Sequence, residues 1–233
     1  SLKDAQKKML KAGGVPGMIL GDLGAKVIRV VDPDPVPIDR DVAWGRAWHR
    51  DKQVIATADS QRIRELITKA DVALVYGSED RIEQHGLGYQ ELSRLNPALI
   101  HARCCPSRTG RGTVADYGLL VEAQSGFCSQ LQGHRPGPIF VDVRAPGCGA
   151  TLLLTTSVLA LLRRRTLSGL GGWTETSLYD GMLATLGTMI GRSESAPEHV
   201  ENYWKKGSTF PNFMYRCADG ELIQVWFGAN PKP

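Results

Sequence analysis

The sequence predicts an α/β fold: a doubly wound parallel sheet, followed by the beginning of a second, smaller domain. Over the first two-thirds of the chain, strand-like runs of β-branched residues alternate with segments of helical periodicity. From about residue 193 the composition becomes polar, and two further strand-like runs flank the turn Ala218-Asp219-Gly220. We therefore expect a large domain over residues 1–192, without its first strand. Over residues 193–233 we expect a linker and the first strands of a truncated small domain.

The N-terminal part predicts a helix, a turn and a buried strand. Residues 4–23 have helical periodicity, and the glycine and proline residues at 13–17 interrupt it. Gly24 is placed to end this helix, and residues 26–31, which include four β-branched residues, predict a buried strand that ends at Asp32. Three prolines within residues 33–37 indicate a loop.

The remainder of the large domain predicts further strands with helices between them. Ser60 is a favourable N-cap for a helix whose Ile63, Leu66 and Ile67 share one face. The longest apolar segment, residues 150–162, is apolar nearly all round and predicts a buried helix. The other predicted strands are 73–76, 99–102, 173–178, 213–215 and 222–227, and the other predicted helices are 89–95, 117–124 and 180–190.

Composition and charge argue against several classes of protein. The 28 Lys and Arg residues exceed the 24 Asp and Glu residues by only four, and they form no basic stripe of the kind that binds nucleic acid. The short basic runs at residues 163–165 and 205–206 are interpreted as solvated surface or a helix C-terminus, with attraction of an anionic ligand as the alternative.

The cysteines and the apolar runs bear on the compartment. There are five cysteines, an odd number without C-x-x-C spacing, so we expect reduced thiols in a cytoplasmic protein rather than a zinc site or a disulfide framework. No continuous apolar run reaches the length of about 18 residues that predicts a membrane span. The charged residues 1–10 do not resemble a signal peptide.

Five segments, in this order along the chain, carry a resemblance to a known family. They are Gly21 to Val30, His49 to Lys52, Gly86 to Tyr89 with Leu95 to Pro97, Ser168 to Gly171, and Arg216 to Gly220. Together they resemble the family III CoA-transferases, which include formyl-CoA transferase, carnitine CoA-transferases and α-methylacyl-CoA racemase. The resemblance extends from about residue 11 to the end of the sequence.

The resemblance implies a fold, a substrate and an assembly. It implies a large Rossmann-like domain, a smaller second domain, and an interlocked dimer in which two ring-shaped monomers thread each other. The partner is then a second copy or a tandem domain. The expected substrate is an acyl-CoA thioester, and the expected reaction is CoA transfer to a carboxylate or epimerisation of a 2-methylacyl-CoA. No metal, nucleic acid or membrane is expected.

The positions that carry catalysis in the family are substituted in this sequence. Family transferases attack the thioester with an aspartate that lies just before the long apolar helix, and the product is a mixed anhydride. Counting back from Gly169 places that position at Gly147, which has no side chain. The histidine that serves as a base in the racemase branch corresponds to Tyr117, a poor base at neutral pH, and Gly118 replaces the acidic residue after it.

Three nearby residues are candidate substitutes for the missing groups. Cys148 follows Gly147 at the predicted helix N-terminus, which lowers the pKa of a thiol; a buried packing cysteine is the alternative. Asp142 lies five residues upstream, where a surface or turn carboxylate is the alternative. Asp116 precedes Tyr117 and is interpreted as a displaced acid.

The contacts that the family makes to CoA are only partly retained. The loop that holds the nucleotide part of CoA corresponds to residues 76–80, where Glu79 and Asp80 are expected to repel phosphates. An arginine of the family aligns with Gln84, and the glycine-rich active-site loop of some transferases corresponds to residues 205–210. The remaining candidates for binding phosphate groups are Arg29, Arg50 and Lys52.

Two functional hypotheses remain open, and a third is weaker. The first is a family III enzyme with substituted or displaced catalytic groups. The second is a non-catalytic member, either the inactive half of a tandem protein or a partner that stabilises an active copy. Dinucleotide binding is the third: the glycine cluster at residues 13–17 and Asp32 at a strand end are typical of such sites, but the strict G-x-G-x-x-G and the strand before it are absent.

Overall fold

The computed structural model describes residues 14–31, 43–77, 79–105, 118–130, 144–186 and 213–225. Residues 14–22 are helical. The strands are β1 (Ile28–Val31), β2 (Gln53–Ala56), β3 (Val72–Tyr76), β4 (Ile100–Cys105), β5 (Gly172–Ser177), β6 (Phe213–Arg216) and β7 (Leu222–Val225). The labelled helices are α2 (Ala43–Trp48), α3 (Ser60–Thr68), α4 (Glu79–Gln84), α5 (Tyr89–Leu95), α6 (Gly118–Gln124), α7 (Phe127–Gln130), α8 (Ala145–Ser168) and α9 (Leu178–Leu186).

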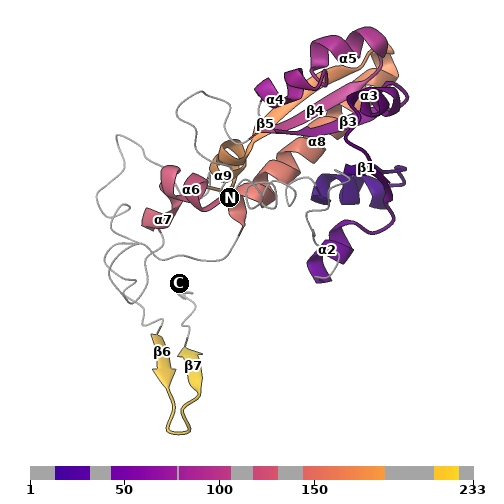
Figure 1. Cartoon of the computed structure of the whole chain (residues 1–233). Coiled ribbons are helices and arrows are strands. Elements are labelled where there is room, and N and C mark those ends of the chain that lie inside the picture. Colours follow the sequence, from indigo (N-terminus) through magenta and orange to yellow (C-terminus); the bar gives the residue numbers. More distant parts are fainter. Residues whose placement is uncertain are drawn as a thin grey trace, which may run out of the picture.

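The strands of the large domain are parallel, which confirms the predicted α/β class. β1 pairs with β2, and β3, β4 and β5 form a second sheet in that order (Figure 1). Parallel neighbours need a crossover connection, and α8 supplies it between β4 and β5. β6 and β7 form an antiparallel hairpin, so the two strands predicted around the Ala218-Asp219-Gly220 turn are present.

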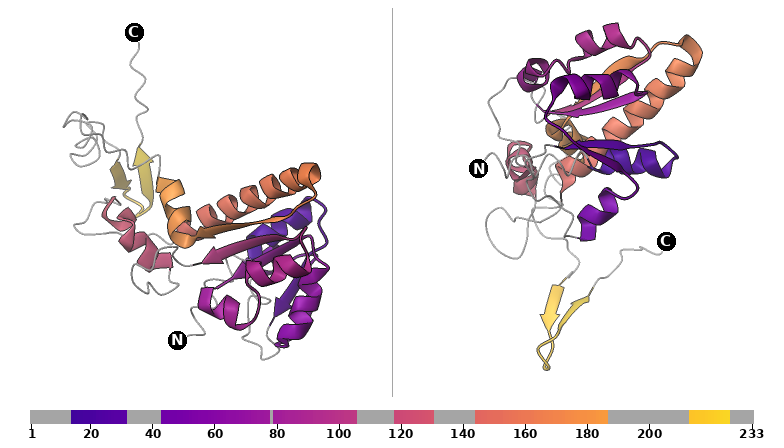
Figure 2. Two further views of the ribbon diagram at one scale, coloured as in Figure 1. Left: turned by 90° about the horizontal axis from the view of Figure 1, so that it is seen from above. Right: turned by 45° about the vertical axis from the view of Figure 1, so that its right-hand side comes forward.

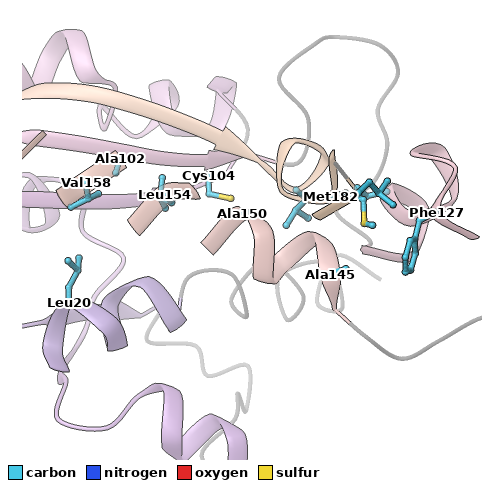
Figure 3. Packing of buried hydrophobic residues seen from close by; sticks show 12 residues of the cluster. Leu20, Ala102, Cys104, Phe127, Ala145, Ala150, Leu154, Val158 and Met182 are labelled. Atoms are coloured by element: carbon cyan, nitrogen blue, oxygen red, sulfur yellow. The ribbon is translucent and has the colours of Figure 1, made fainter. Parts of the chain in front are cut away.

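Helices cover both faces of the three-stranded sheet. α8 and α9 lie on one face, and α3, α4 and α5 lie on the other (Figures 1 and 2). On the first face Leu154, Val158 and Met182 are buried in one cluster with Ala102 and Cys104 of β4 (Figure 3). On the second face the buried side chains are Ala73, Val75, Ile82, Leu92 and Leu99. Burial on both faces explains why β3 and β4 are apolar without alternation.

The expectation of a fully buried apolar helix is wrong for the outer face of α8. Leu154 and Val158 are buried, but Leu152 is 62% exposed and Leu159 is 42% exposed, because only one side of α8 packs on the sheet and α9. Among the described residues, α8 is the one helix that is long and apolar enough to cross a membrane by length and composition. In this fold it is the central core helix.

Three local expectations need correction. The helix is continuous over residues 14–22, because Gly14 and Gly17 serve close packing rather than a break. The N-cap of α3 is Asp59, whose carboxylate accepts a hydrogen bond from Gln61 N–H at 2.9 Å, and not Ser60. β1 is not a buried strand, since Ile28 is 42% exposed and Val30 is 37% exposed. Residues 32–42, which include the predicted proline loop, lie outside the described residues.

Two glycines fix the crossing of α8 and α9. A Cβ atom at Gly149 would lie 2.0 Å from the backbone oxygen of Gly181. A Cβ atom at Gly181 would lie 2.4 Å from the oxygen of Pro146 and 2.2 Å from the nitrogen of Ala150. The two backbones are therefore in direct contact, and no larger residue fits at either position without moving a helix.

We predict that Gly149→Ala and Gly181→Ala each lower the free energy of unfolding by at least about 1–3 kcal/mol, the usual cost of overpacking. Gly147→Ala is the matched control in the same helix, since a Cβ there would meet no atom within 4 Å. We expect it to be neutral or to stabilise by about 0.5–1 kcal/mol, because alanine favours a helix. Urea denaturation followed by circular dichroism measures all three, and equal effects at Gly147 and Gly149 would contradict the packing argument.

Candidate functional site

The N-termini of α8 and α9 lie at the carboxyl edge of the sheet. α6 and α7 come between β4 and α8 in the chain, α8 runs back along the sheet to the start of β5, and α9 begins directly after β5. Open α/β sheets bind their ligands at this edge. Gly149 and Gly181 hold the first turns of the two helices against each other here. Gly147, the predicted nucleophile position, lies in the first turn of α8 and therefore at this edge.

The first turn of α8 carries no acidic residue. Gly147 lies in this turn and is half-buried, and a side chain added there would point into open space. Cys148 is exposed, so the alternative of a buried packing cysteine is wrong. The N-cap residue Arg144 makes no side-chain capping bond to the helix. An added carboxylate at Gly147 would thus have both room and a favourable helix end.

The acidic residue nearest in sequence to the contact between Gly149 and Gly181 caps a helix. Asp180, in the first turn of α9, accepts a hydrogen bond from Ser177 N–H at 3.0 Å, and Ser177 Oγ accepts one from Asp180 N–H at 3.0 Å. This reciprocal pair is a capping box, which satisfies two helix-terminal N–H groups. The capping geometry holds the Asp180 carboxylate on the backbone of its own helix.

The structure does not describe the other catalytic candidates. Tyr117, Asp116 and Asp142 lie outside the described residues. α6 begins at Gly118, in agreement with the predicted helix, and it contacts α8 and α9. Sequence reasoning missed Glu122, a carboxylate of α6 that is only 5% exposed. The available signal was an acid within the otherwise apolar run from Leu119 to Ala123.

A second polar group forms where the helix over residues 14–22 packs on β1 and β2. Lys52 Nζ donates a hydrogen bond to the Gly14 oxygen at 2.6 Å and would lie 3.3 Å from a Cβ at Gly17. The His49 ring packs at 3.0 Å from the position of a Cβ at Gly14. The glycines that resembled a dinucleotide-binding cluster thus admit the side chains of His49 and Lys52.

Burial and neighbouring positive charges make the protonated forms of Lys52 and His49 less favourable. Burial, followed by Arg29 and Arg50, lowers the pKa of Lys52 from 10.5 to about 8. Burial, followed by Arg29 and Lys52, lowers the pKa of His49 from 6.5 to about 4, so His49 is neutral at pH 7. Both His49 ring nitrogens are buried without a hydrogen-bond partner. We call Arg29, His49 and Lys52 the cationic cluster, because the positive charge of Arg29 acts on both His49 and Lys52.

Arg50 plays a different part from Arg29 and Lys52. Its guanidinium pairs with the Asp22 carboxylate and donates to the Ala47 oxygen at 2.8 Å, so it ties the end of the helix over residues 14–22 to the residues before β2. Asp51, which follows it, has a φ of 56°. Asn and Asp tolerate this left-handed conformation best among residues with a side chain. The turn directs Arg50 and Lys52 to different partners.

The acids expected to repel phosphate are partly neutralised. Arg103 of β4 donates to the Glu175 carboxylate at 2.5 Å and lies 3.5 Å from the Glu79 carboxylate. Arg103 and Glu175 are cross-strand neighbours on β4 and β5, and both side chains are largely buried. The helix of residues 79–84 is thus linked to the sheet through Glu79. Among the described residues no group of three or more His, Cys, Asp or Glu side chains is placed to hold a metal ion.

Residues 7–232 match the model of one protein family, described as CoA-transferase family III. The chain belongs to this family. Its membership confirms the resemblance carried by the five sequence segments, and it is consistent with the α/β fold and parallel strands described above.

Individual relatives include both transferases and a racemase. The chain is 27% identical over 241 residues to the succinyl-CoA–D-citramalate CoA-transferase of Chloroflexus aurantiacus, covering 94% of this chain and 58% of that protein. It is 29% identical over 233 residues to the α-methylacyl-CoA racemase of Mus musculus, covering 93% of this chain and 58% of that protein. The chain thus spans little more than half the length of these relatives.

Solved structures of the family share the fold. The Mycobacterium tuberculosis protein Rv3272 in its orthorhombic form has a TM-score of 0.66 and 26% identity, with 76% of this chain and 54% of that chain covered. A CaiB/BaiF family protein of Brucella suis has a TM-score of 0.68 at 21% identity, covering 90% of this chain and 61% of that chain. At 21% identity, the similarity to the Brucella suis protein shows the fold alone.

We predict that the Lys52 amine titrates near pH 8 in the purified protein, which NMR of the labelled side chain measures. Arg29→Gln should raise this pKa, because it removes a neighbouring positive charge, but not to 10.5, because burial remains the largest cause. A Lys52 titration near pH 10.5, the ordinary lysine value, would contradict the cationic cluster.

Proposed function

We propose that this chain is a family III CoA-transferase-like protein that binds a CoA thioester, and that Gly147 occupies its own nucleophile position. The observation that carries the proposal is the absence of an acid from the first turn of α8, at a place that has room for one. At family level the reaction is CoA transfer from an acyl-CoA to a carboxylate, or epimerisation of a 2-methylacyl-CoA. The names of the relatives, succinyl-CoA-dependent transferases and a racemase, support this range.

The substitution at Gly147 bears on the covalent step. In the transferase reaction a carboxylate oxygen attacks the thioester carbonyl, the carbon–sulfur bond breaks, and CoA leaves as a thiolate. A glycine offers no atom for this attack. Cys148 is exposed beside it, and Asp116 precedes the racemase base position, so these two remain the candidate substitutes. We infer that neither forms an acyl adduct, because neither replaces a carboxylate at the same backbone position.

The cationic cluster is where we place the phosphates of CoA. Arg29 and Lys52 lie together, and their mutual repulsion is what a phosphate group would offset. Lys52 uses one of its three N–H donors on the Gly14 oxygen, so others remain to meet an anion. Arg50, the third candidate, is bound to Asp22 and supports the cluster by holding the adjoining backbone. No metal is part of this proposal.

The second candidate function is a non-catalytic one. A family member without a nucleophile can be one half of a tandem protein or a partner that stabilises an active copy. The acid-free first turn of α8 favours this candidate for the chain's own chemistry. The interlocked dimer, the cytoplasmic location and the division into a large domain of residues 1–192 and a small-domain segment of residues 193–233 belong to the same proposal.

We predict that CoA binds to the purified chain and that its affinity falls as the pH rises above about 8. Protonated Lys52 attracts the phosphates, and it loses its proton there. Lys52→Gln should weaken binding and remove this fall, whereas Lys69→Gln, an exposed lysine at the end of α3, should change neither. Isothermal calorimetry at several pH values measures the effect. Absence of binding at millimolar CoA would refute the proposed ligand.

We predict that the chain forms no acyl adduct with succinyl-CoA or acetyl-CoA in the presence of hydroxylamine, as read from the intact mass. Gly147→Asp should gain a hydroxylamine-dependent adduct, because a side chain there meets no atom within 4 Å. Gly147→Asn fills the same space without a nucleophilic carboxylate and is the matched control. An adduct on the natural sequence, mapped to Cys148 or Asp116 by peptide mass, would overturn the non-catalytic interpretation.

A further inference from the structure

His101 is a buried histidine that the proposed function does not use. It lies on β4, the central strand of the three-stranded sheet, and is only 3% exposed. Its ring lies on the face of the sheet that α4 and α5 cover, whereas its neighbour Ala102 lies in the cluster of α8 (Figure 1). A side chain that can change its charge near neutral pH is therefore enclosed in the core.

One ring nitrogen of His101 holds the turn before α5. Nε2 lies 3.0 Å from the Leu87 oxygen. A carbonyl oxygen can only accept a hydrogen bond, so Nε2 carries the hydrogen. Leu87 lies between α4 and α5, and its own N–H donates to the Ile82 oxygen at 3.0 Å. The bond from His101 therefore ties the connection of these two helices to the central strand.

The other ring nitrogen of His101 has no hydrogen-bond partner. Nδ1 is buried, and in the neutral ring it carries a lone pair rather than a hydrogen. Burial is the largest influence and lowers the pKa of His101 below 6.5; the bond to Leu87 raises it, the charge of Arg103 lowers it, and the backbone of His101 itself raises it least. Because burial disfavours the charged form most strongly, the enclosed ring is held neutral.

The groups around the His101 ring offer no compensating negative charge. The centroid of the Tyr89 ring, in the first turn of α5, lies 6.1 Å from that of His101 and 6.4 Å from that of Trp173. The neighbours of His101 on β3 and β5 are Ala73 and Trp173, which are uncharged. Among the described residues, Arg103 is the one charged group that acts on the His101 charge, and it pairs with Glu175.

The layer over His101 is held less firmly than the strand beneath it. β4 is hydrogen-bonded to β3 on one side and to β5 on the other. α5 has seven residues and buries one of them, Leu92. Its link to α3 is the pair of Arg64 and Glu91 at 2.9 Å, in which both side chains are partly exposed, and such a pair contributes little. Local opening therefore affects α5 before it affects the sheet.

We propose that protonation of His101 releases α5 and the turn before it from the sheet, so that this layer is an acid-sensitive cover over Leu92 and Leu99. In the released state the ring is in water and has its ordinary pKa of about 6.5. The pKa of the closed state is lower, so the closed state is fully favoured above pH 6.5 and loses its advantage as the pH falls below that value. One proton separates the two states, so the equilibrium constant for opening increases by up to about tenfold for each pH unit.

Amide hydrogen exchange of the full chain, resolved by NMR between about pH 7.5 and pH 5.5, tests this proposal. The protection factor compares each amide with an unstructured chain at the same pH. Leu92 N–H donates to the Gly88 oxygen at 3.1 Å, and Asn96 N–H donates to the Leu92 oxygen at 2.9 Å. We expect the protection factors of Leu92 and Asn96 to fall by up to about tenfold per pH unit below about pH 6.5. Val158, in the middle of α8, should keep a higher protection factor at every pH.

A pair of histidine variants assigns the effect to one ring. His101→Gln cannot be protonated but keeps a side-chain N–H group for the Leu87 oxygen, and we expect the protection of Leu92 to lose its dependence on pH. His85→Gln is the matched control, because His85 is exposed after α4, and it should retain that dependence. The other histidine with a lowered pKa, His49, packs on the helix over residues 14–22 and is unchanged in both variants.

Several results would overturn the proposal. Equal protection factors for Leu92 and Val158 would mean that the whole domain opens and not α5 alone. A fall in His101→Gln as steep as in the natural chain would assign the effect to another group. NMR titration of the His101 ring in the natural chain is independent of the variants, and a midpoint at about 6.5 with Leu92 still protected would show that the closed state tolerates the charge. None of these measurements involves CoA, so the proposed function stands or fails separately.

Discussion

The contact between the backbones of α8 and α9 at Gly149 and Gly181 determines where the first turns of these two helices lie. Two helices can approach so closely only where neither has a side chain. The contact holds both first turns at the carboxyl edge of β4 and β5, and α8 then packs its buried face on the sheet along its length. Gly147, the predicted nucleophile position, lies in the first turn of α8 that this crossing holds in place. The crossing does not restrict the side chain at position 147, because a Cβ there would meet no atom within 4 Å.

At the start of α8, the packing of the helix is therefore independent of which residue stands at position 147. Glycines 149 and 181 are needed for packing, and replacing either costs stability, whereas position 147 is free to change. The packing of the two helices therefore places no constraint on which side chain stands at position 147. The nearby Asp180 carboxylate has a structural role, since it accepts a hydrogen bond from Ser177 N–H in the capping box of α9.

The cationic cluster shows how burial and neighbouring positive charges lower the pKa of basic side chains. Arg29, His49 and Lys52 meet because Gly14 and Gly17 leave space beside the helix over residues 14–22. The result is a lysine whose pKa falls to about 8 and a histidine that stays neutral at pH 7. Arg50 is excluded from this role by its pairing with Asp22. A phosphate at the cluster would raise the pKa of Lys52, which links ligand binding to proton uptake.

The sequence by itself determined the family, the α/β class and the parallel strands. These follow from local periodicity and from short segments in a fixed order, which do not depend on distant contacts. Tertiary structure alone decided that the glycines of residues 14–17 admit side chains, that one face of α8 is exposed, and that Arg50 and Lys52 separate. It also decided that Glu122 is buried. Such features arise from which elements pack together, and periodicity carries no information about pairs of residues far apart in the chain.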